Sequence, residues 1–467
     1  MVFSTSLFLF LFLSIILGVY YIVPRNARNL VILLASCVFY FWGEQVYFAI
    51  MVLSTVVDFI HGLLVEYFLR KEKDKAAKGV VASSILLNLG ILFFFKYWDF
   101  IATSLGNIGL KFMPVLGIHL PIGISFYTFQ TMSYTIDVYR GDVRAQKNII
   151  NFGTFVTMFP QLIAGPIIKY KDLGDQIDSR TSTVTQFAAG VKKFTVGLAK
   201  KLLIANNVGS LWEMIKGTPL NEQIVIGTWI GVIAFSLQIY FDFSGYSDMA
   251  IGLGKMFGFE FLPNFNYPYI SKSITEFWRR WHISLSIWFR EYLYIPLGGN
   301  RCSTWRWICN LFIVWACTGL WHGASWNYLF WGLFFFLVLV LEKVFFSKWL
   351  LRLPVFLQHG YTLILVVISW AIFALEDFDY LLGFMRIMCG CGGVPLMNMQ
   401  TYYYLKQYLP ILCIAVVAST PAGVTLVRKI PSKIMVIVEP VLLIVGLLVC
   451  TAYLVAETYN PFLYFRF

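Results

Sequence analysis

Apolar runs long enough to cross a lipid bilayer recur from one end of this chain to the other. A helix needs about 20 mostly apolar residues to span the hydrocarbon core of a membrane, and residues 3–23 and 434–455 form such runs near the two ends. Hydrophobic residues make up 59% of the chain and charged residues 13%, a composition that excludes a string of soluble domains. A membrane barrel would show short segments of alternating polarity, which this sequence lacks. The chain is therefore predicted to be an all-α, multi-pass membrane protein.

Basic residues lie in short clusters between the apolar runs. Arg25 and Arg28 follow the first run, and residues 70–78 hold a denser cluster after the third. Cytoplasmic loops collect Lys and Arg in this way, so Met1 is predicted to lie outside and the first three spans to alternate. A net charge of +12 is also found in proteins that bind nucleic acid. Here the basic residues are scattered in short clusters between apolar runs, so no nucleic-acid partner is expected. Residues 70–78 are interpreted as a solvated loop, with binding of lipid headgroups as the alternative.

Some segments are too polar, or too rich in Gly and Pro, to be simple spans. Residues 121–130 and 159–166 combine Pro and Gly with hydroxyls or amides, a pattern typical of broken or re-entrant elements that protein or water surrounds. Residues 307–341 would form one helix of about 50 Å, which exceeds a membrane core of about 30 Å. A break is therefore expected at Gly319 and Gly323. The sequence predicts about ten to twelve spans of about 20 residues, with re-entrant or broken helices, in a single domain.

That domain covers residues 1–467, because the sequence has no internal repeat and no flexible linker. Two of its five histidines, His282 and His322, each follow a tryptophan inside residues 278–326. An ionisable side chain among apolar runs is uncommon unless it is paired or functional. Imidazole, with a pKa of about 6.5, can accept a hydroxyl proton near neutral pH. Backbone N–H groups freed by a break beside His322 could also stabilise an oxyanion.

Structural roles remain open for both histidines. His322 could be a buried histidine hydrogen-bonded between helices, and His282 an interfacial histidine among Trp and Arg. Haem or metal ligation by the pair is a weaker alternative, because no further histidine lies nearby. Cys389 and Cys391 lack the second pair that a zinc site needs. No metal site and no bound cofactor are expected, and the eight cysteines are expected to be free, buried thiols.

Charged residues in and before residues 278–326 are candidates for binding substrate. Asp242 and Asp248 lie six residues apart in apolar sequence, and such carboxylates either pair with cations or face an interior cavity. Arg279, Arg280 and Arg290 could hold an anionic donor, or anchor the chain at a membrane boundary.

The motifs that carry chemistry come in a fixed order: residues 121–130, 159–166, 240–258, 277–301, 319–327 and the closing residues 459–467. Taken together they resemble the membrane-bound O-acyltransferase family, and in particular its bacterial branch that O-acetylates alginate and related exopolysaccharides. The resemblance spans nearly the whole chain. It implies a ring of helices around a central tunnel, where donor and acceptor meet from opposite faces.

By this resemblance His322 matches the family's catalytic histidine and His282 its second active-site residue, while Trp321 and Asn327 belong to the same motif and are expected to contact substrate. The donor is expected to be an acyl thioester, in the first place acetyl-CoA, that enters from the cytoplasm. The acceptor would be a polysaccharide such as alginate, reached through an extracytoplasmic partner transferase. The expected location is the cytoplasmic (inner) membrane of a bacterium, in contact with membrane lipid.

Two alternatives remain. The Trp281-His-Ile-Ser-Leu-Ser286 and Trp321-His-Gly323 motifs also look similar to the branch that transfers D-alanine to teichoic acid, whereas residues 298–301 and 460–462 look more like the acetylating branch. From a different class, a transporter or export channel would use Asp242, Asp248 and the histidines to line a path. The absence of internal repeats and the clustering of chemistry around two histidines argue against a transporter.

Overall fold

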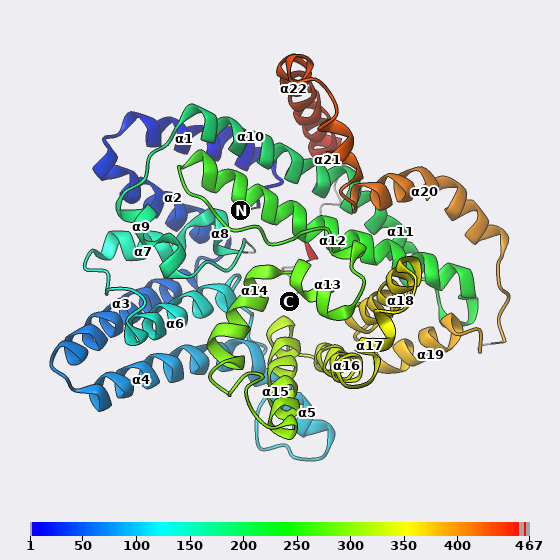
Figure 1. Ribbon diagram of the computed structural model, residues 1–467, viewed down its shortest axis with the longest axis horizontal. Helices are drawn as coiled ribbons and strands as arrows, with labels where there is room; N and C mark the ends of the chain where they lie inside the picture. The colour runs from blue at the N-terminus through cyan, green and yellow to red at the C-terminus, as the bar shows by residue number, and fades with distance from the viewer. Residues whose placement is uncertain (1, 164, 392, 457–461, 464–467) are drawn as a thin grey trace. The chain divides into compact units, whose positions relative to one another are not determined.

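The structure is a computed structural model that describes residues 2–163, 165–391, 393–456 and 462–463. Within these residues the chain consists of helices joined by turns and loops and contains no β-strand (Figure 1). The prediction of an all-α fold is therefore confirmed. Of the closing motif at residues 459–467, only Phe462 and Leu463 are described, and Ala164 of the 159–166 motif also lies outside the described residues.

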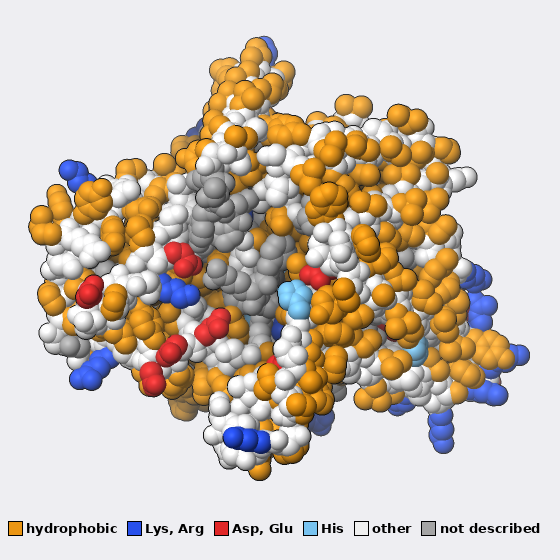
Figure 2. Space-filling view, turned by 180° about the vertical axis from the view of Figure 1, so that it is seen from behind, with side chains coloured by type: hydrophobic (Ala, Val, Ile, Leu, Met, Phe, Trp, Pro, Cys, Tyr) orange, Lys and Arg blue, Asp and Glu red, His pale blue; other side chains and the backbone are white. Residues whose placement is uncertain are grey.

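Six of the described helices are long and apolar enough to cross a membrane: Phe48–Arg70, Asp74–Asn107, Val225–Met256, Trp326–Leu350, Val355–Ala374 and Ser432–Ala456. The apolar helices Leu7–Ile22 and Ile149–Leu162 are shorter. Apolar side chains cover much of the surface seen in Figure 2, as contact with lipid requires. The chain is a multi-pass membrane protein. A total of ten to twelve spans would require some of the shorter helices to cross the membrane as well. That number stays a prediction.

The described residues divide into two compact units. The first comprises residues 1–194 and 246–262, and the second comprises residues 195–245 and 263–467. Helices α10 (Val184–Ala199) and α12 (Val225–Met256) contribute residues to both. The single domain expected over residues 1–467 stays a prediction.

The first unit is built mainly from apolar helices in sequence order. Its elements are η1 (Leu7–Phe12), α1 (Leu13–Ile22), η2 (Arg25–Ala27), α2 (Arg28–Gly43), α3 (Phe48–Arg70), α4 (Asp74–Leu92), η3 (Phe93–Tyr97), α5 (Trp98–Asn107), α6 (Ile124–Arg140), α7 (Ile149–Thr157), α8 (Phe159–Leu162) and α9 (Tyr170–Asp178). Pro24 separates the first two spans, since the residue before a proline disfavours helix. The charged cluster at residues 70–78 is a loop only at residues 71–73, because Arg70 ends α3 and residues 74–78 already belong to α4.

Both segments expected to be broken contain an interruption. The chain turns at Gly123, whose φ is +78°, and then continues as the regular helix α6, so residues 124–130 are helical. A Cβ at Gly123 would lie 2.8 Å from the carbonyl oxygen of Leu162, which explains the glycine. In the second segment the short helix α8 ends at Leu162, and a further break at Met158 separates α8 from α7 just before the segment begins. Only the turn before α6, rather than the whole of residues 121–130, departs from a helix.

The second unit holds the tryptophan- and histidine-rich stretch. Its remaining elements are η4 (Lys200–Ala205), α11 (Asn206–Lys216), η5 (Leu220–Glu222), η6 (Pro268–Ile270), α13 (Ile274–Arg280), α14 (Ile283–Phe289), η7 (Arg290–Tyr294), α15 (Thr304–His322), α16 (Trp326–Leu341), η8 (Glu342–Phe346), α17 (Ser347–Leu350), α18 (Val355–Ala374), α19 (Phe378–Met388), α20 (Met399–Ala418), α21 (Ala422–Val427) and α22 (Ser432–Ala456). Its core is aromatic and includes Trp278, Trp281, Trp331 and Trp370. Trp331 of this core packs against His322, with ring centroids 5.0 Å apart.

The eight cysteines are free, as expected, but they are not all buried. Cys389, Cys391 and Cys413 are exposed, and Cys450 is the one buried thiol of the eight. Cys389 and Cys391 follow α19 in a glycine-rich turn, and Cys413 lies on a face of α20 that the chain leaves uncovered. An apolar helix in lipid can expose a thiol without loss, so hydropathy alone overestimated burial.

Candidate active site

The stretch around His282 begins with a short helix whose first turn is capped from two directions. Ser273 accepts a hydrogen bond from the backbone N–H of Glu276 at 3.0 Å. The buried carboxylate of Glu342 accepts from the N–H groups of Ile274 and Thr275, at 2.8 and 3.1 Å. A negative charge at the start of a helix is favourable. Helix α13 is thereby fixed to η8, and the residues that follow α13 start from a defined position.

His282 occupies an unusual backbone conformation directly after α13. Its φ is +44° and its ψ is +55°, the left-handed region that a non-glycine residue rarely adopts. Such a conformation costs about 1–3 kcal/mol and persists where surrounding contacts impose it. The Ile283 N–H donates to the Asn264 carbonyl oxygen at 2.9 Å, one of the contacts that hold this turn. The side chain of His282 is fully buried.

Asn264 determines how the His282 ring is oriented. Its side-chain oxygen lies 3.1 Å from Nδ1 of His282 and accepts from the Ser284 N–H at 3.2 Å and the Ser284 hydroxyl at 2.9 Å. Because a backbone N–H can only donate, the Asn264 atom is the oxygen. Nδ1 of His282 must then carry the proton and donate, so Nε2 is the basic nitrogen. This is the arrangement by which a neighbour fixes the tautomer of a functional histidine.

Burial keeps His282 neutral. His282 lies outside the candidate membrane spans, and burial, followed by the charge of His322, holds the pKa of His282 well below its ordinary value of 6.5. His282 is therefore held in its neutral form.

His322 is the last residue of α15, where the predicted break occurs. Gly323 is extended, with φ −176° and ψ +156°, and α16 begins at Trp326. Gly319 stays helical and serves a different purpose, because a Cβ there would overlap the carbonyl oxygen of Tyr328. A Cβ at Gly332 would likewise overlap the carbonyl oxygen of Trp315. The two glycines bring α15 and α16 into close contact, as small residues do between membrane helices.

Aromatic side chains enclose His322. Its ring centroid lies 5.0 Å from that of Trp331 and 5.6 Å from that of Phe373, both edge-on. Asn327 donates from Nδ2 to the Phe373 carbonyl oxygen at 2.9 Å, which ties the start of α16 to the end of α18. Asn327, expected to contact substrate, thus holds one wall of the His322 site in place.

Trp321 connects the two histidines. Its ring centroid lies 5.8 Å from that of His282 and 5.1 Å from that of His322. His282 also meets Phe243 of α12, with ring centroids 4.7 Å apart and the rings nearly perpendicular. Residues 40 positions apart in the sequence are thereby brought to one indole ring.

Arg279 and Arg290 share an open pocket of about 530 Å³ in the second unit, which we call the arginine pocket. Its walls come from α13, α14, η7, α15 and α16 and are mainly apolar. Ser286 and Thr318 also line it, and each lies four residues, about one helical turn, from His282 or His322.

The three arginines have different surroundings. Arg279 makes no hydrogen bond or ion pair with any residue in the described part of the chain, and Arg290 pairs only with Glu291, at 3.5 Å. Arg280 does not line the arginine pocket. Its guanidinium pairs with Glu276 at 2.9 Å and donates to the Asn266 carbonyl oxygen at 3.0 Å. Arg280 therefore stabilises the turn before His282 rather than facing a ligand.

Asp242 and Asp248 both pair with lysines. Asp242 lies 2.7 Å from Lys201 in the second unit, with both side chains 3% exposed. It also accepts from the backbone N–H of Leu463 at 2.9 Å. Asp248 lies 2.7 Å from Lys193 in the first unit. Of the two roles the sequence left open for these carboxylates, the structure shows cation pairing.

The described residues contain no group of three or more His, Cys, Asp or Glu side chains that could hold a metal ion. Two residues that position the site, Asn264 and Glu342, were not found from the sequence. Each lies far along the chain from its partner, His282 or Ile274, in an unremarkable local sequence. Only the folded chain reveals their roles.

Fold and site together define a helical, multi-pass membrane protein with two histidines in contact with one buried tryptophan. The family model of the membrane-bound O-acyltransferases matches residues 142–375, which include both histidines. The probable alginate O-acetylase AlgI of Pseudomonas aeruginosa is 46% identical over 81% of this chain and 72% of its own length. The chain belongs to the membrane-bound O-acyltransferase family and is an acyltransferase.

Two other relatives carry different names. The peptidoglycan O-acetyltransferase of Helicobacter pylori is 32% identical, over 86% of this chain and 82% of its own length. The teichoic acid D-alanyltransferase of Bacillus subtilis is 26% identical, over 63% of this chain and 76% of its own length.

Proposed function

We propose that this enzyme O-acetylates an extracytoplasmic polysaccharide, such as alginate, at the cytoplasmic membrane of a bacterium. The observation that carries the proposal is the contact of both His282 and His322 with the ring of Trp321. Identity of 46% to an alginate O-acetylase, against 26% to a D-alanyltransferase, favours acetyl over D-alanyl transfer.

The donor is an acetyl thioester, with acetyl-CoA as the first candidate, and its binding site is the arginine pocket. Coenzyme A carries phosphates joined to a thin pantetheine arm. Arg279 has no competing partner among the described residues, and a guanidinium is well suited to phosphate. The apolar walls suit the arm, and Ser286 and Thr318 stand about one helical turn from the histidines. The acetyl group would thus be delivered beside the imidazoles.

In the proposed reaction His322 removes the proton from the acceptor hydroxyl. The oxygen then attacks the thioester carbonyl, a C–O bond forms, and the C–S bond breaks. The departing sulfur takes the proton back from His322, so no proton is gained or lost overall. In a variant with two steps, the acetyl group is first transferred to His322 and then from His322 to the acceptor.

His282 assists because it remains neutral. Burial holds its pKa well below 6.5, so it adds no positive charge when His322 becomes an imidazolium. Its ring is held in one orientation by the hydrogen bond from Nδ1 to Asn264. His282 and His322 are accordingly proposed as catalytic residues, with Trp321 holding both rings.

The acceptor on the far side of the membrane is proposed to be a serine of a partner transferase, which passes the acetyl group on to the polymer.

A transporter is the weaker alternative, because Asp242 and Asp248 form ion pairs with lysines rather than lining an open path with bare carboxylates.

The test is thioester consumption by the purified protein in vesicles, with acetyl-CoA outside and partner plus polysaccharide inside. Wild type is compared with His322→Ala and with His119→Ala, whose side chain is 71% exposed. We expect His322→Ala to lose consumption and acceptor acetylation together, while His119→Ala keeps both. Normal turnover in a folded His322→Ala protein would assign that histidine a structural role.

Two further comparisons separate the donor site from the alternatives. Arg279→Gln should raise KM for acetyl-CoA with little change in kcat, whereas Arg280→Gln, which breaks a surface pair with Glu276, should leave KM unchanged. Consumption of a D-alanyl thioester but not of acetyl-CoA would favour the D-alanyl branch. Movement of polysaccharide without thioester consumption would favour a transporter.

A further inference from the structure

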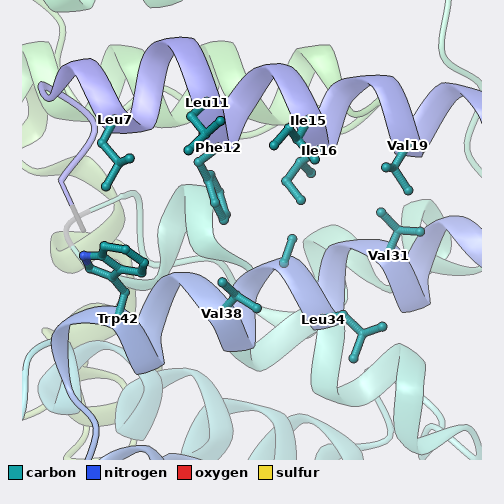
Figure 3. A pocket seen from close by; sticks show the side chains of 11 residues that line it. Leu7, Leu11, Phe12, Ile15, Ile16, Val19, Val31, Leu34, Val38 and Trp42 are labelled. Carbon is teal, nitrogen blue, oxygen red and sulfur yellow. The ribbon is translucent and has the colours of Figure 1, made fainter.

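A second pocket lies in the first unit, between its first two helical segments, and we call it the α1–α2 groove. Its volume is about 400 Å³. Its walls come from η1, α1 and α2 and are apolar throughout, with Phe12 and Ile16 on one side and Val38 and Trp42 on the other. Figure 3 shows the two helices side by side, with Val19 and Val31 at one end of the groove and Leu7 and Trp42 at the other.

The end marked by Val19 and Val31 adjoins the basic turn between the two helices. Arg28 begins α2, three residues before Val31. Residues 28, 31, 35, 38 and 42 are spaced by three or four, so they follow one face of the helix, and the last four of them line the groove. Arg28 therefore continues the stripe that forms the groove wall, at the end predicted to face the cytoplasm.

The guanidinium of Arg28 has no carboxylate partner in the described part of the chain. It packs over the rings of Tyr20 and Tyr21, at 4.9 and 5.5 Å from their centroids, and its Nε is buried without a hydrogen bond. Arg180 also lies against Tyr20, at 5.8 Å, and its Nη2 is likewise buried without a hydrogen bond. Burial, and to a lesser extent the charge of Arg28, lower the pKa of Arg180. Two cations thus face one site, with no compensating charge beside Arg28.

Neighbouring acidic groups do not neutralise this site. Residues 1–43 contain no Asp or Glu. The hydrogen bonds of the neighbouring Asn29 lead to Asp178, which accepts from Gln146 and Asn151 at 3.1 and 2.8 Å. Asn151 in turn accepts from Asn29 at 2.8 Å. Asp178 is therefore engaged elsewhere.

We propose that the α1–α2 groove binds one anionic glycerophospholipid of the cytoplasmic leaflet, with an acyl chain along the groove and the phosphate at Arg28. Basic pockets between membrane helices on the cytoplasmic side bind anionic headgroups in this way. From Val31 to Trp42 the groove is about 16 Å long, close to the half-thickness, about 15 Å, of a membrane core. It therefore matches the chains of one leaflet.

A transmembrane helix of a partner fits less well. An apolar helix would cover the walls of the groove but would bring no anion to Arg28. A free phosphate would use only the arginine end and leave the apolar walls uncovered. An acyl chain joined to a phosphate would cover the apolar walls and place an anion at Arg28.

The experiment is native mass spectrometry of the full-length protein titrated with phosphatidylglycerol or with phosphatidylcholine carrying the same acyl chains. We expect one tightly bound phosphatidylglycerol per chain. Arg28→Gln should weaken it about fivefold, the effect of one basic residue at a membrane surface, and remove the preference over phosphatidylcholine. Val31→Phe, which fills the mouth of the groove, should weaken both lipids.

Matched variants control for unspecific effects. Arg144→Gln removes an exposed arginine of the first unit, and Val52→Phe enlarges a partly exposed valine of α3 outside the groove. Both should bind as wild type does. Equal binding by Arg28→Gln and Arg144→Gln, or displacement of the lipid by glycerol phosphate, would overturn the proposal. A monodisperse profile and an unchanged thermal midpoint establish that Arg28→Gln and Val31→Phe are folded.

Discussion

The ring of Trp321 lies 5.8 Å from that of His282, at an angle of 64°, while the adjacent His322 ring lies 5.1 Å from the same indole. One side chain therefore sets the positions of both histidines relative to each other. Trp321 is 4% exposed and belongs to the last turn of α15. Its loss would leave space into which either imidazole can turn.

Trp321→Ala is therefore expected to lower kcat about a hundredfold, the effect of a misplacement of about 1 Å in a catalytic site. Trp321→Phe, which keeps an aromatic ring beside both histidines, should retain more activity than Trp321→Ala. The measurement is acetyl transfer in vesicles, and Trp305→Ala, at a tryptophan that is 74% exposed, is the control. Equal rates in Trp321→Ala and Trp305→Ala would show that the indole does not position the histidines.

Asn264 is expected to act through His282. Asn264→Leu removes the oxygen that accepts from Nδ1, so the ring loses its fixed tautomer and kcat should fall about 10- to 100-fold, as for other residues that orient a functional histidine. Asn264→Asp keeps an accepting oxygen and should recover part of the rate. Asn266→Ala, two residues along the same loop, is the matched control. A change in KM for the donor without a change in kcat would place Asn264 in binding instead.

The buried, neutral state of His282 makes stability depend on pH. Burial, and then His322, lower its pKa well below 6.5, so in the folded protein it stays neutral while in the unfolded chain it takes up a proton below about pH 6.5. The unfolded state then binds more protons, and the free energy of unfolding falls as the pH drops below about 6.5. His282→Gln should weaken this fall.

Thermal unfolding of both proteins in detergent, from about pH 8 to about pH 5, checks this expectation. Above about pH 6.5 the difference between the two midpoints should be constant, and below it the difference should narrow. His359→Gln, at a partly buried histidine whose Nδ1 meets the Ser271 carbonyl oxygen at 3.1 Å, is the control. Parallel curves for wild type and His282→Gln down to the lowest pH would contradict a neutral, buried His282.

Membrane class and the helix break after His322 could be predicted from the sequence, because each depends on local composition, whereas only the structure decides between the two roles of Asp242, through its pair with Lys201. Asn264 and Glu342 could not be predicted, because they act on residues 18 and 68 positions away. The sequence also grouped Arg280 with Arg279, since adjacent arginines look alike until Glu276 is seen to pair with one of them. Hydropathy likewise could not tell that Cys413 faces outward.

Close packing of α15 against α16 is expected to be sensitive at Gly319. A methyl group there would overlap the Tyr328 carbonyl oxygen, and backbone atoms on both sides leave little room to adjust. Gly319→Ala should destabilise the protein by about 1–3 kcal/mol, as added volume does in packed interiors. Gly360→Ala in α18 is the matched control, since a Cβ there meets nothing within 4 Å. It should be neutral or slightly stabilising, and equal melting midpoints of the two variants would contradict a close α15–α16 contact.

The two lysine–aspartate pairs on α12 should differ sharply in what they contribute. Lys201 and Asp242 are both 3% exposed, whereas the Lys193 side chain of the other pair is 40% exposed. Removing one partner of a buried pair leaves an uncompensated charge and costs about 3–5 kcal/mol, while an exposed pair is worth about 0–1 kcal/mol. Lys201→Met should therefore lower the free energy of unfolding far more than Lys193→Met does.

The double variant Lys201→Met/Asp242→Asn decides whether the unpaired charge is the cause. Replacing the carboxylate by an amide removes that charge, and the side-chain oxygen can still accept from the Leu463 N–H, which lies 2.9 Å from Asp242. Most of the lost stability should return in the double variant, measured by unfolding in denaturant. If the double variant is as unstable as Lys201→Met alone, packing of the lysine stem, rather than neutralisation of Asp242, is what Lys201 supplies to this part of α12.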